Sequence, residues 1–340
     1  MKEFFNCNGG TRMYNIAIVG ASGLVGGTFL KVLEERNLPI KNLYLFASTR
    51  SAGKKVIFKG KILIIEELTE KSFDRKIDIA LFSAGGDISK KFAPIANKKG
   101  VIVIDNSSAW RMDKSVPLIV PEVNSEEIFK NEGIIANPNC STIQSVVPLK
   151  IIDDLYGIKR VIYSTYQAVS GSGIKGMEDL KRGLVGEEAK TYPHPIVNNC
   201  LPHIDSFLEN GYTKEEEKMI NETRKILNKK NLPITATCVR VPVLNGHSIS
   251  INVELEKEVN LEELRDKFKE AKGIVFRDDI GNNIYPLATE ATGTDEVYVG
   301  RLRKDFSIEK GLNLWVVADN IRKGAATNAV QIAEILMKKK

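Results

Sequence analysis

The sequence predicts an α/β protein of two domains: a doubly wound parallel sheet, then an α+β domain with a mainly antiparallel sheet. In residues 13–140, short apolar runs alternate with helical stretches, which is the pattern of a parallel sheet covered on both faces. After about residue 140, the strand-like segments become longer, alternate along the chain and are rich in β-branched residues, which favours antiparallel strands. A chain of 340 residues is long enough for two domains.

The elements of the first domain follow from its apolar runs. The first run ends at Gly20, and the helical pattern after it stops at Asn37 and Pro39. The expected strands are 16–19, 43–46, 77–82 and 101–104, and the expected helices are 25–35 and 89–99. This alternation predicts the doubly wound topology.

In the second domain, strands are expected over residues 161–168, 247–254, 297–299 and 314–317, and helices over 212–227 and 261–271. The last helix, 325–337, has one apolar face and is expected to return to the first domain. The predicted boundaries are therefore 13–140, completed by 321–340, and 141–320. Residues 1–12 are predicted to be a disordered extension before Met13, a candidate start.

Composition argues against several classes of function. The chain is 43% apolar and 27% charged, as in an ordinary globular protein. Its net charge of +6 includes no basic run interleaved with aromatic residues, which argues against nucleic acid; a mildly basic surface and a site for anionic substrates both remain open. No apolar run reaches the ~20 residues of a membrane helix, and the polar N-terminus is unlike a secretory signal, so a cytoplasmic protein is predicted.

The four cysteines do not indicate disulfides or a metal centre. Their spacing is wide and irregular, and no CxxC pair occurs. Cys200 and His203 are two potential ligands, but nothing nearby in the sequence completes a set, so no metal is predicted.

A glycine-rich turn follows the first expected strand, and it consists of Gly20, Ala21, Ser22, Gly23, Leu24, Val25 and Gly26. Glycine suits a tight turn whose backbone approaches a pyrophosphate, with the N–H groups of the next helix facing the phosphates. The spacing is GxxGxxG, not GxGxxG, so an ordinary turn is the alternative. Its position in the first strand–helix turn favours a Rossmann-like dinucleotide-binding domain.

The end of the second expected strand indicates the cofactor. NAD-binding domains usually place an acid there for the ribose hydroxyls. This sequence has Ser48, Arg50 and Ser51 instead. Hydroxyls and a guanidinium suit a 2′-phosphate, which favours NADP; a solvated loop arginine is the alternative.

Cys140 is the candidate nucleophile. It stands in the run NPNCST between a short apolar run and a helical stretch, so it is expected where a loop enters a helix. There the helix dipole and free N–H groups stabilise a thiolate and can hold an oxyanion. A buried structural cysteine is the alternative, and the polar neighbours argue against it.

A thiolate nucleophile also needs a proton partner, and the chain has three histidines. His194 lies between two prolines and His203 follows one, so both suit the bracing of a turn. His247 follows Gly246 and opens an expected strand. The residues alone do not choose among the three.

From Tyr14 to the C-terminal helix, the chain resembles the aspartate-semialdehyde dehydrogenase family. The stretches that carry the resemblance are GASGLVG at Gly20, STRSAGKK at Ser48, DNSSAWRMD at Asp105, NPNCSTIQ at Asn137, TYQAVSGSG at Thr165, EEEKMINETRKIL at Glu215, RVPVLNGHS at Arg240 and DNIRKGAATNA at Asp319. None is decisive alone, but in this order they are highly specific. Ser22 replaces a threonine that is frequent in the family.

The resemblance implies an NADPH-dependent reduction of L-aspartyl 4-phosphate to L-aspartate 4-semialdehyde through a cysteine thioester. This reaction serves the biosynthesis of lysine (through diaminopimelate), threonine, methionine and isoleucine. The resemblance makes Cys140 the nucleophile and His247 the acid/base. The resemblance also implies that Gln167 orients the thioester, that Arg240 binds the α-carboxylate and that Glu215 binds the α-amine. The residues that it assigns to phosphate binding are Lys218, Arg111 and Asn106. Because Glu216 and Glu217 are adjacent to Glu215, a one-residue slip in the alignment with the family would change which glutamate binds the α-amine, and that alternative stays open.

For the cofactor, the resemblance implies the turn 20–26 with Ser48, Arg50 and Ser51. It also implies Ser170 with Gly171, and Asn320 near the nicotinamide. The family further implies at least a homodimer, with a homotetramer as the alternative.

Three alternative functions remain. An N-acetyl-glutamyl-phosphate reductase has an acetylated substrate amine, for which an acid at Glu215 has less to do. A reductase of a CoA thioester, such as malonyl-CoA, would not depend on phosphate. A catalytically silent homologue is expected to lack Cys140, Gln167, Arg240 or His247, and all four are present.

Overall fold

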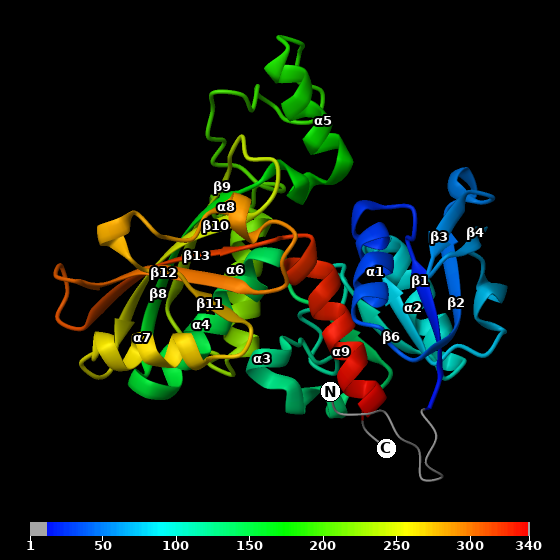
Figure 1. Ribbon diagram of the computed structural model, residues 1–340, viewed down its shortest axis with the longest axis horizontal. Helices are drawn as coiled ribbons and strands as arrows, with labels where there is room; N and C mark the ends of the chain where they lie inside the picture. Colours follow the sequence, from blue (N-terminus) through cyan, green and yellow to red (C-terminus); the bar gives the residue numbers. More distant parts are fainter. Residues whose placement is uncertain (1–11, 339–340) are drawn as a thin grey trace. The chain divides into compact units, whose positions relative to one another are not determined.

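The computed structural model describes residues 12–338, and Figure 1 shows its elements. The chain divides into two compact units, the first comprising 1–138 with 325–340 and the second 139–324. The first division therefore falls two residues before the expected boundary at 140. The chain returns to the first unit at Ala325, four residues after the expected 321. Apart from Arg12, the predicted N-terminal extension lies outside the described residues.

The described residues of the first unit form a seven-stranded sheet in the order β3-β4-β2-β1-β5-β6-β7. Its strands are β1 (Tyr14–Val19), β2 (Ile40–Ala47), β3 (Lys55–Phe58), β4 (Lys61–Glu67), β5 (Ile79–Phe82), β6 (Ile102–Asp105) and β7 (Ile134–Ala136). All neighbours run parallel except β3, which pairs antiparallel with β4 at the edge. The expected doubly wound domain is confirmed.

The sequence analysis missed the β3–β4 hairpin. Ile57, Ile62 and Ile64 point to solvent from one face of the hairpin, while Phe58 and Ile65 are buried on the other. Because both faces carry apolar side chains, the hairpin lacks the alternation of polar and apolar residues that marks a half-buried strand.

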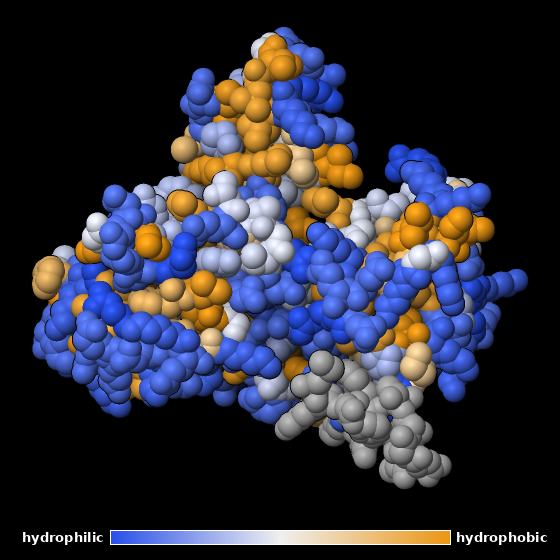
Figure 2. Space-filling model, viewed as in Figure 1, coloured by the Kyte–Doolittle hydropathy of each residue, from blue (hydrophilic) through white to orange (hydrophobic). Residues whose placement is uncertain are grey.

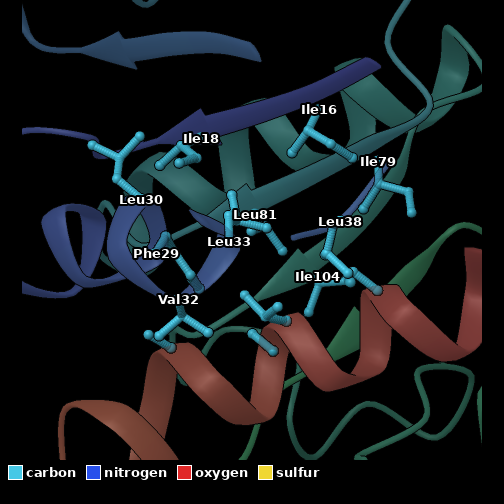
Figure 3. Packing of buried hydrophobic residues seen from close by; sticks show 14 of the residues in the cluster. Ile16, Ile18, Phe29, Leu30, Val32, Leu33, Leu38, Ile79, Leu81 and Ile104 are labelled. Atoms are coloured by element: carbon cyan, nitrogen blue, oxygen red, sulfur yellow. The ribbon is translucent and has the colours of Figure 1, made fainter. Parts of the chain in front are cut away.

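Helices cover the sheet of the first unit. They are α1 (Leu24–Glu35), α2 (Gly86–Lys98), α3 (Pro121–Asn124) and α9 (Thr327–Lys338), and a π-helical turn, Arg322–Ala326, leads into α9. Figure 3 shows Phe29 and Leu33 of α1 packed towards Ile16 and Ile18 of β1. The helix α9 belongs to the same apolar cluster and contacts α1, which explains the apolar stripe along its sequence.

Residues 139–324 contain a six-stranded sheet in the order β11-β12-β13-β10-β8-β9. Its strands are β8 (Ile158–Gln167), β9 (Ile234–Arg240), β10 (His247–Leu255), β11 (Ile274–Phe276), β12 (Val297–Asp305) and β13 (Gly311–Ala318). The four central strands are antiparallel, as expected. The outer strands β9 and β11, which were not predicted, pair parallel with β8 and β12, so the sheet is mixed.

Helices of the second unit position the ends of these strands. They are α4 (Cys140–Tyr156), α5 (Gly173–Leu184), α6 (Lys214–Ile226), α7 (Leu261–Glu270) and α8 (Ala288–Ala291). Helix α4 contacts α6 and strands β8, β10 and β13, while α6 contacts β9. The unpredicted α5 leaves Ile174, Leu184 and Val185 exposed, and Figure 2 shows apolar side chains gathered around it at the top of the view.

Candidate active site

The half-buried Cys140 is the first residue of α4, where a loop enters the helix. Asn139 caps this helix: its Oδ1 accepts the backbone N–H groups of Ser141 and Thr142 at 2.9 and 3.3 Å. The helix start that carries the nucleophile is thereby fixed. The same two bonds engage N–H groups that the sequence analysis expected to be available for an oxyanion.

Glu215, buried on the first turn of α6, connects several of the expected site residues. Its Oε1 accepts from Asn139 Nδ2 at 2.8 Å and from Gln167 Nε2 at 3.1 Å. Its Oε2 lies 3.1 Å from Lys218 Nζ, one helical turn further on. One carboxylate thus joins the residue before the nucleophile, the end of β8 and a lysine.

The neighbouring glutamates have different partners. Glu216 forms a capping box with Thr213, and its Oε1 accepts the Cys238 backbone N–H at 3.0 Å. Glu217 accepts amide groups from Asn210 and Asn221 at 3.3 and 2.8 Å. Of the three adjacent acids, the structure brings Glu215 together with Asn139, Gln167 and Lys218.

Electrostatics keep this cluster ionised. Burial would raise the pKa of Glu215, but Lys218 and the hydrogen bonds from Asn139 and Gln167 outweigh burial and hold the pKa below its usual value. Burial would lower the pKa of Lys218, but the carboxylates of Glu215 and Asp205 raise it. The cluster therefore pairs a buried carboxylate with an ammonium at neutral pH.

The sequence analysis missed two residues of this network. Asp205 Oδ2 lies 2.7 Å from Lys218 Nζ, and Glu222 Oε2 accepts the backbone N–H of Asn139 at 2.6 Å. Glu222 follows Glu215 by two helical turns on the same face of α6, and this spacing was the available signal. Nothing in the local sequence links Asp205 to Lys218.

Arg240 is buried at the end of β9, and its Nη1 donates to the Ala168 carbonyl at 2.7 Å. Among the described residues, no side chain or backbone group accepts a hydrogen bond from its Nε. A Cβ at Gly171 would lie 2.6 Å from Arg240 Nη1, so a side chain there would displace the guanidinium. The buried Arg240 therefore keeps a donor available for an anionic partner.

His247 is fully buried at the start of β10. Its Nδ1 accepts the Ala168 backbone N–H at 3.0 Å, and its Nε2 lies 3.5 Å from Gln167 Nε2. Burial, followed by the nearby Arg240 cation, lowers its pKa well below the usual value of 6.5. His194 is exposed and His203 stacks on Phe207 at 4.2 Å, so His247 is the histidine that joins Gln167.

Ser170 and Asn320 lie near the start of β10 as well. Asn320 Nδ2 donates to Ser170 Oγ at 3.0 Å, and Asn320 Oδ1 accepts the Gly246 backbone N–H at 3.0 Å. These bonds link the segments after β8 and β13 to the residue before His247.

In the first unit, the glycine turn shapes a cavity of about 390 Å³. Gly20 has φ +91°, and a Cβ there would collide with the Ser83 carbonyl; a Cβ at Gly26 would collide with the Gly20 carbonyl. The lining of the cavity includes Gly20, Ser22, Gly23, Ala47, Ser48, Leu68, Ile88 and Phe92. A tight polar turn facing an apolar wall fits the phosphates and the adenosine of a dinucleotide.

Arg50 and Ser51 lie on the 3₁₀ turn Thr49–Ser51, directly after the cavity-lining Ser48 in the sequence, and Arg50 is exposed. Glu67, at the end of β4, lines the cavity and was not predicted. It lies in register with Ala47, the last residue of β2, and accepts the Thr49 hydroxyl at 2.5 Å. The acid that β2 lacks is thus supplied to the same sheet edge by β4.

Comparisons with known proteins identify the family of this chain. Residues 15–131 match the family model "Semialdehyde dehydrogenase, NAD binding domain", and residues 149–323 match "Semialdehyde dehydrogenase, dimerisation domain". The aspartate-semialdehyde dehydrogenase of Aquifex aeolicus is 60% identical over 334 residues, which cover 96% of this chain and 98% of that protein. The Bacillus subtilis enzyme is 47% identical over 341 residues, which cover 96% of this chain and 98% of that protein.

The chain belongs to the aspartate-semialdehyde dehydrogenase family.

Solved structures of this family have the same fold. The Vibrio cholerae aspartate semialdehyde dehydrogenase II, in complex with ASA, matches with a TM-score of 0.93 and 48% identity over 96% of this chain and 99% of that one. The Candida albicans enzyme, solved with NADP, matches with a TM-score of 0.77 and 25% identity over 96% and 98%. The chain is therefore an oxidoreductase of the phosphorylating aldehyde dehydrogenase class, which uses NADP, and its first unit is the nucleotide-binding domain.

The positions that the resemblance assigns to phosphate fall in both units. In the first unit, Arg111 is buried; its Nε donates to the Asn137 carbonyl at 2.9 Å and its Nη2 to the Asn106 carbonyl at 2.7 Å. The Asn106 side chain is held between the Phe82 carbonyl and Asn137 Nδ2. Lys218, the third expected phosphate residue, belongs to the second unit.

Two further expectations concern metals and membranes. Within residues 12–338, no group of three or more His, Cys, Asp or Glu side chains is arranged to bind a metal ion, and Cys200 and His203 gain no third ligand. None of the helices in this range has both the length and the hydropathy needed to cross a membrane.

Proposed function

We propose that this chain converts L-aspartyl 4-phosphate to L-aspartate 4-semialdehyde with NADPH, through a thioester on Cys140. The observation that carries the proposal is a pair of buried ionic groups, the Glu215 carboxylate and the Arg240 guanidinium. A substrate with both an α-amine and an α-carboxylate complements this pair. The proposed reaction serves the biosynthesis of lysine, threonine, methionine and isoleucine.

Each end of the substrate has a partner in this assignment. Glu215 is assigned to the α-ammonium group because its carboxylate is ionised and carries the opposite charge. Three hydrogen bonds, from the amides of Asn139 and Gln167 and from Lys218, hold this carboxylate in place. Arg240 receives the α-carboxylate through its remaining donors, which include Nε. Lys218, Arg111 and Asn106 are assigned to phosphate, on the basis of charge and family position.

The covalent step belongs to Cys140. Its thiolate attacks the acyl carbon; the C–S bond forms, the C–O bond to phosphate breaks, and inorganic phosphate leaves. NADPH, when bound, supplies the hydride that reduces the thioester carbonyl. Breaking the C–S bond then releases the aldehyde and restores the thiolate. Gln167 and His247 are assigned to the carbonyl oxygen.

The cofactor assignment rests on the first unit. The turn from Gly20 to Gly26 and Ser48 would hold the pyrophosphate and the adenosine, with Arg50 and Ser51 meeting the 2′-phosphate of NADP. Ser170, Gly171 and Asn320 of the second unit are assigned to the nicotinamide end.

A homodimer through the second unit is the proposed assembly, with a homotetramer as the alternative. Ser248 and Ser250 of β10 face away from the buried Ile249 and Ile251, so the outer face of this sheet is open in the single chain. A cavity of about 420 Å³ on this face is lined by residues that include the paired aromatic rings of Tyr166 and Trp315. Light scattering of the purified protein measures the assembly, and a cytoplasmic location remains a prediction.

The test of the reaction is phosphate-dependent reduction of NADP by the purified protein with L-aspartate semialdehyde. Parallel reactions use N-acetylglutamate semialdehyde and omit phosphate. Activity with the aspartate compound and only in the presence of phosphate is expected. Activity with the acetylated compound would assign the chain to the glutamyl-phosphate branch. Turnover with CoA in place of phosphate would indicate a CoA-thioester reductase, and no turnover at all would indicate a silent homologue.

A further inference from the structure

The cavity of the first unit contains a charge that NADP does not explain. Of the described residues that line this cavity, Glu67 alone is charged, and the others are glycine, alanine, serine, threonine or larger apolar residues. The charge is negative, although the chain belongs to an enzyme class that uses NADP, whose 2′-phosphate is an anion. A carboxylate beside a phosphate repels it and weakens binding. Glu67 therefore fits a different group of the ligand.

The sheet brings Glu67 to the end of β2. Ala47 and Glu67 are the last residues of the neighbouring parallel strands β2 and β4, and they are paired in register (Figure 1). The Leu68 backbone N–H donates to the Ala47 carbonyl at 2.8 Å, which holds the two strand ends side by side. Paired residues of adjacent strands place their side chains on the same face of the sheet. The Glu67 side chain consequently lies on the face where Ala47 has only a methyl group.

An acid at this edge suits the hydroxyls of a ribose. In dinucleotide-binding domains of this topology, a carboxylate at the end of the second strand accepts hydrogen bonds from the ribose of NAD. A carboxylate only accepts hydrogen bonds, and each free ribose hydroxyl has one to donate. In this chain the strand beside β2 carries the acid that β2 itself lacks.

Thr49 orients the Glu67 carboxylate. Its hydroxyl donates to Glu67 Oε1 at 2.5 Å. Within residues 12–338, this is the one hydrogen bond of the Glu67 side chain, and no cation lies within ion-pair distance of it. The second carboxylate oxygen, Oε2, thus retains its capacity to accept hydrogen bonds from a ligand.

The cation at the same edge does not neutralise this acid. Arg50 directly follows Thr49 and is exposed, and no carboxylate of the described part of the chain pairs with it. Glu67 and Arg50 therefore each keep a charge that a ligand can meet. A guanidinium complements a 2′-phosphate, whereas a carboxylate complements a free 2′-hydroxyl.

We propose that Glu67 sets the cofactor specificity of this chain, and that the edge formed by Glu67 and Arg50 accepts NAD as well as NADP. Glu67 binds the free 2′-hydroxyl of NAD, and Arg50 binds the 2′-phosphate of NADP. The nicotinamide ring is the same in both cofactors, so hydride transfer in the proposed reaction balances identically with either. This inference rests on the cofactor assignment proposed above for the first unit.

The first experiment measures binding of NAD and NADP to the full-length protein by titration calorimetry, without substrate. The unsubstituted protein should bind both cofactors. Because an exposed acid opposes an exposed cation, it should prefer NADP by less than about 100-fold. A larger preference for NADP would overturn the proposal.

The second experiment compares Glu67→Gln with a matched variant of the preceding residue. In Glu67→Gln, NAD affinity should fall about threefold because the amide is a weaker acceptor, and NADP affinity should rise about threefold because the repulsion is removed. The control is Glu66→Gln. Glu66 pairs with Arg75 through two hydrogen bonds of 2.9 Å and does not line the cavity, so both affinities should change less than about twofold. If Glu67→Gln changes both affinities in the same direction, or changes neither, the proposal is wrong.

Salt separates the electrostatic role of Glu67 from a structural one. The screening length falls from about 10 Å at 0.1 M salt to about 3 Å at 1 M. The gain in NADP affinity of Glu67→Gln should therefore shrink at 1 M salt, whereas the loss in NAD affinity should persist because it reflects a direct hydrogen bond. An undiminished gain at 1 M salt would overturn the proposal.

Arg50→Ala distinguishes failure of this proposal from failure of the cofactor assignment. It should weaken NADP binding and change NAD affinity less than about twofold. If it does so while Glu67→Gln leaves NAD affinity unaltered, the cofactor assignment stands and the role of Glu67 falls. If neither variant changes the affinity for either cofactor, the assignment of the edge itself falls, and the proposal falls with it.

Discussion

The two sites of this protein are built in opposite ways. In the first unit, the proposed cofactor site is a glycine turn and a sheet edge, and Ser48, Arg50 and Glu67 are exposed around it. In the second unit, the proposed catalytic and substrate-binding side chains come from α4, α6, β8, β9 and β10. Glu215, Gln167 and His247 are buried there, and Glu215 joins Gln167 to Asn139 through hydrogen bonds. Backbone shape dominates the first site, and side-chain placement dominates the second. Single side-chain changes should therefore have much larger effects in the second unit.

Cys140→Ala is expected to have the largest effect. Without the thiolate there is no covalent step, so kcat should fall by at least about 10⁴-fold. NADP binding, followed by fluorescence titration, should remain unchanged because Cys140 is not among the residues assigned to the cofactor. The exposed Cys200 offers a matched control, and Cys200→Ala should leave turnover near its original level. Substantial activity in Cys140→Ala would remove the nucleophile assignment.

Arg240→Lys tests whether the buried fork is required. A lysine keeps the charge but loses the planar donors, so KM for the semialdehyde should rise about 10- to 100-fold, equivalent to about 1.4–2.8 kcal/mol. Steady-state kinetics with varied semialdehyde and saturating phosphate and NADP measure this change. An unaltered KM would show that the carboxylate binds elsewhere.

Glu215→Gln and Glu217→Gln form a matched pair on α6. The first removes the charge assigned to the α-amine and disturbs the partners of Asn139 and Gln167, so kcat/KM should fall about 10²-fold. The second changes a residue whose side chain accepts hydrogen bonds from Asn210 and Asn221, outside this network, and should change kcat/KM less than about twofold. The reverse order of effects would move the assignment along the helix.

The neutral burial of His247 should also make the fold sensitive to acid. Its pKa is lower in the folded chain than the usual 6.5, so below that pH the unfolded chain binds more protons and the free energy of unfolding decreases as pH falls. The loss is at most about 1.4 kcal/mol per pH unit. Urea denaturation at several pH values should show a shallower decline in His247→Gln. Parallel curves for the two proteins would contradict the buried neutral ring.

The smallest effects are expected at the cofactor edge. Glu67→Gln removes a negative charge near the proposed 2′-phosphate position, so NADP affinity should rise about threefold and NAD affinity should fall. Arg50→Ala should shift the ratio of NADP to NAD affinity in the opposite direction. Binding titrations with both cofactors measure the two ratios. Changes as large as those in the second unit would contradict the contrast between the two sites.

The elements that the sequence predicted well are those with a local signal. The first strand, the glycine turn and α1 are consecutive, and their pattern is the result of tight turning and burial within a few residues. The hairpin of β3 and β4 and the strand β9 lacked such a signal. Their strand character depends on neighbours in the sheet, and in β3 and β4 the exposed isoleucines obscured the alternation.

The sequence by itself determined the two-part α/β plan, the nucleotide-binding turn, the family and the types of side chain needed for thioester chemistry. Tertiary structure decided which histidine meets Gln167, which of three adjacent glutamates joins the network, and which ring nitrogen of His247 accepts the Ala168 N–H. The deciding hydrogen bonds join residues 76 and 79 positions apart, Asn139 to Glu215 and Ala168 to His247. The local sequence specifies the chemical type of each side chain. Its protonation state and its hydrogen-bond partners depend on burial and on donors that only the folded chain brings together.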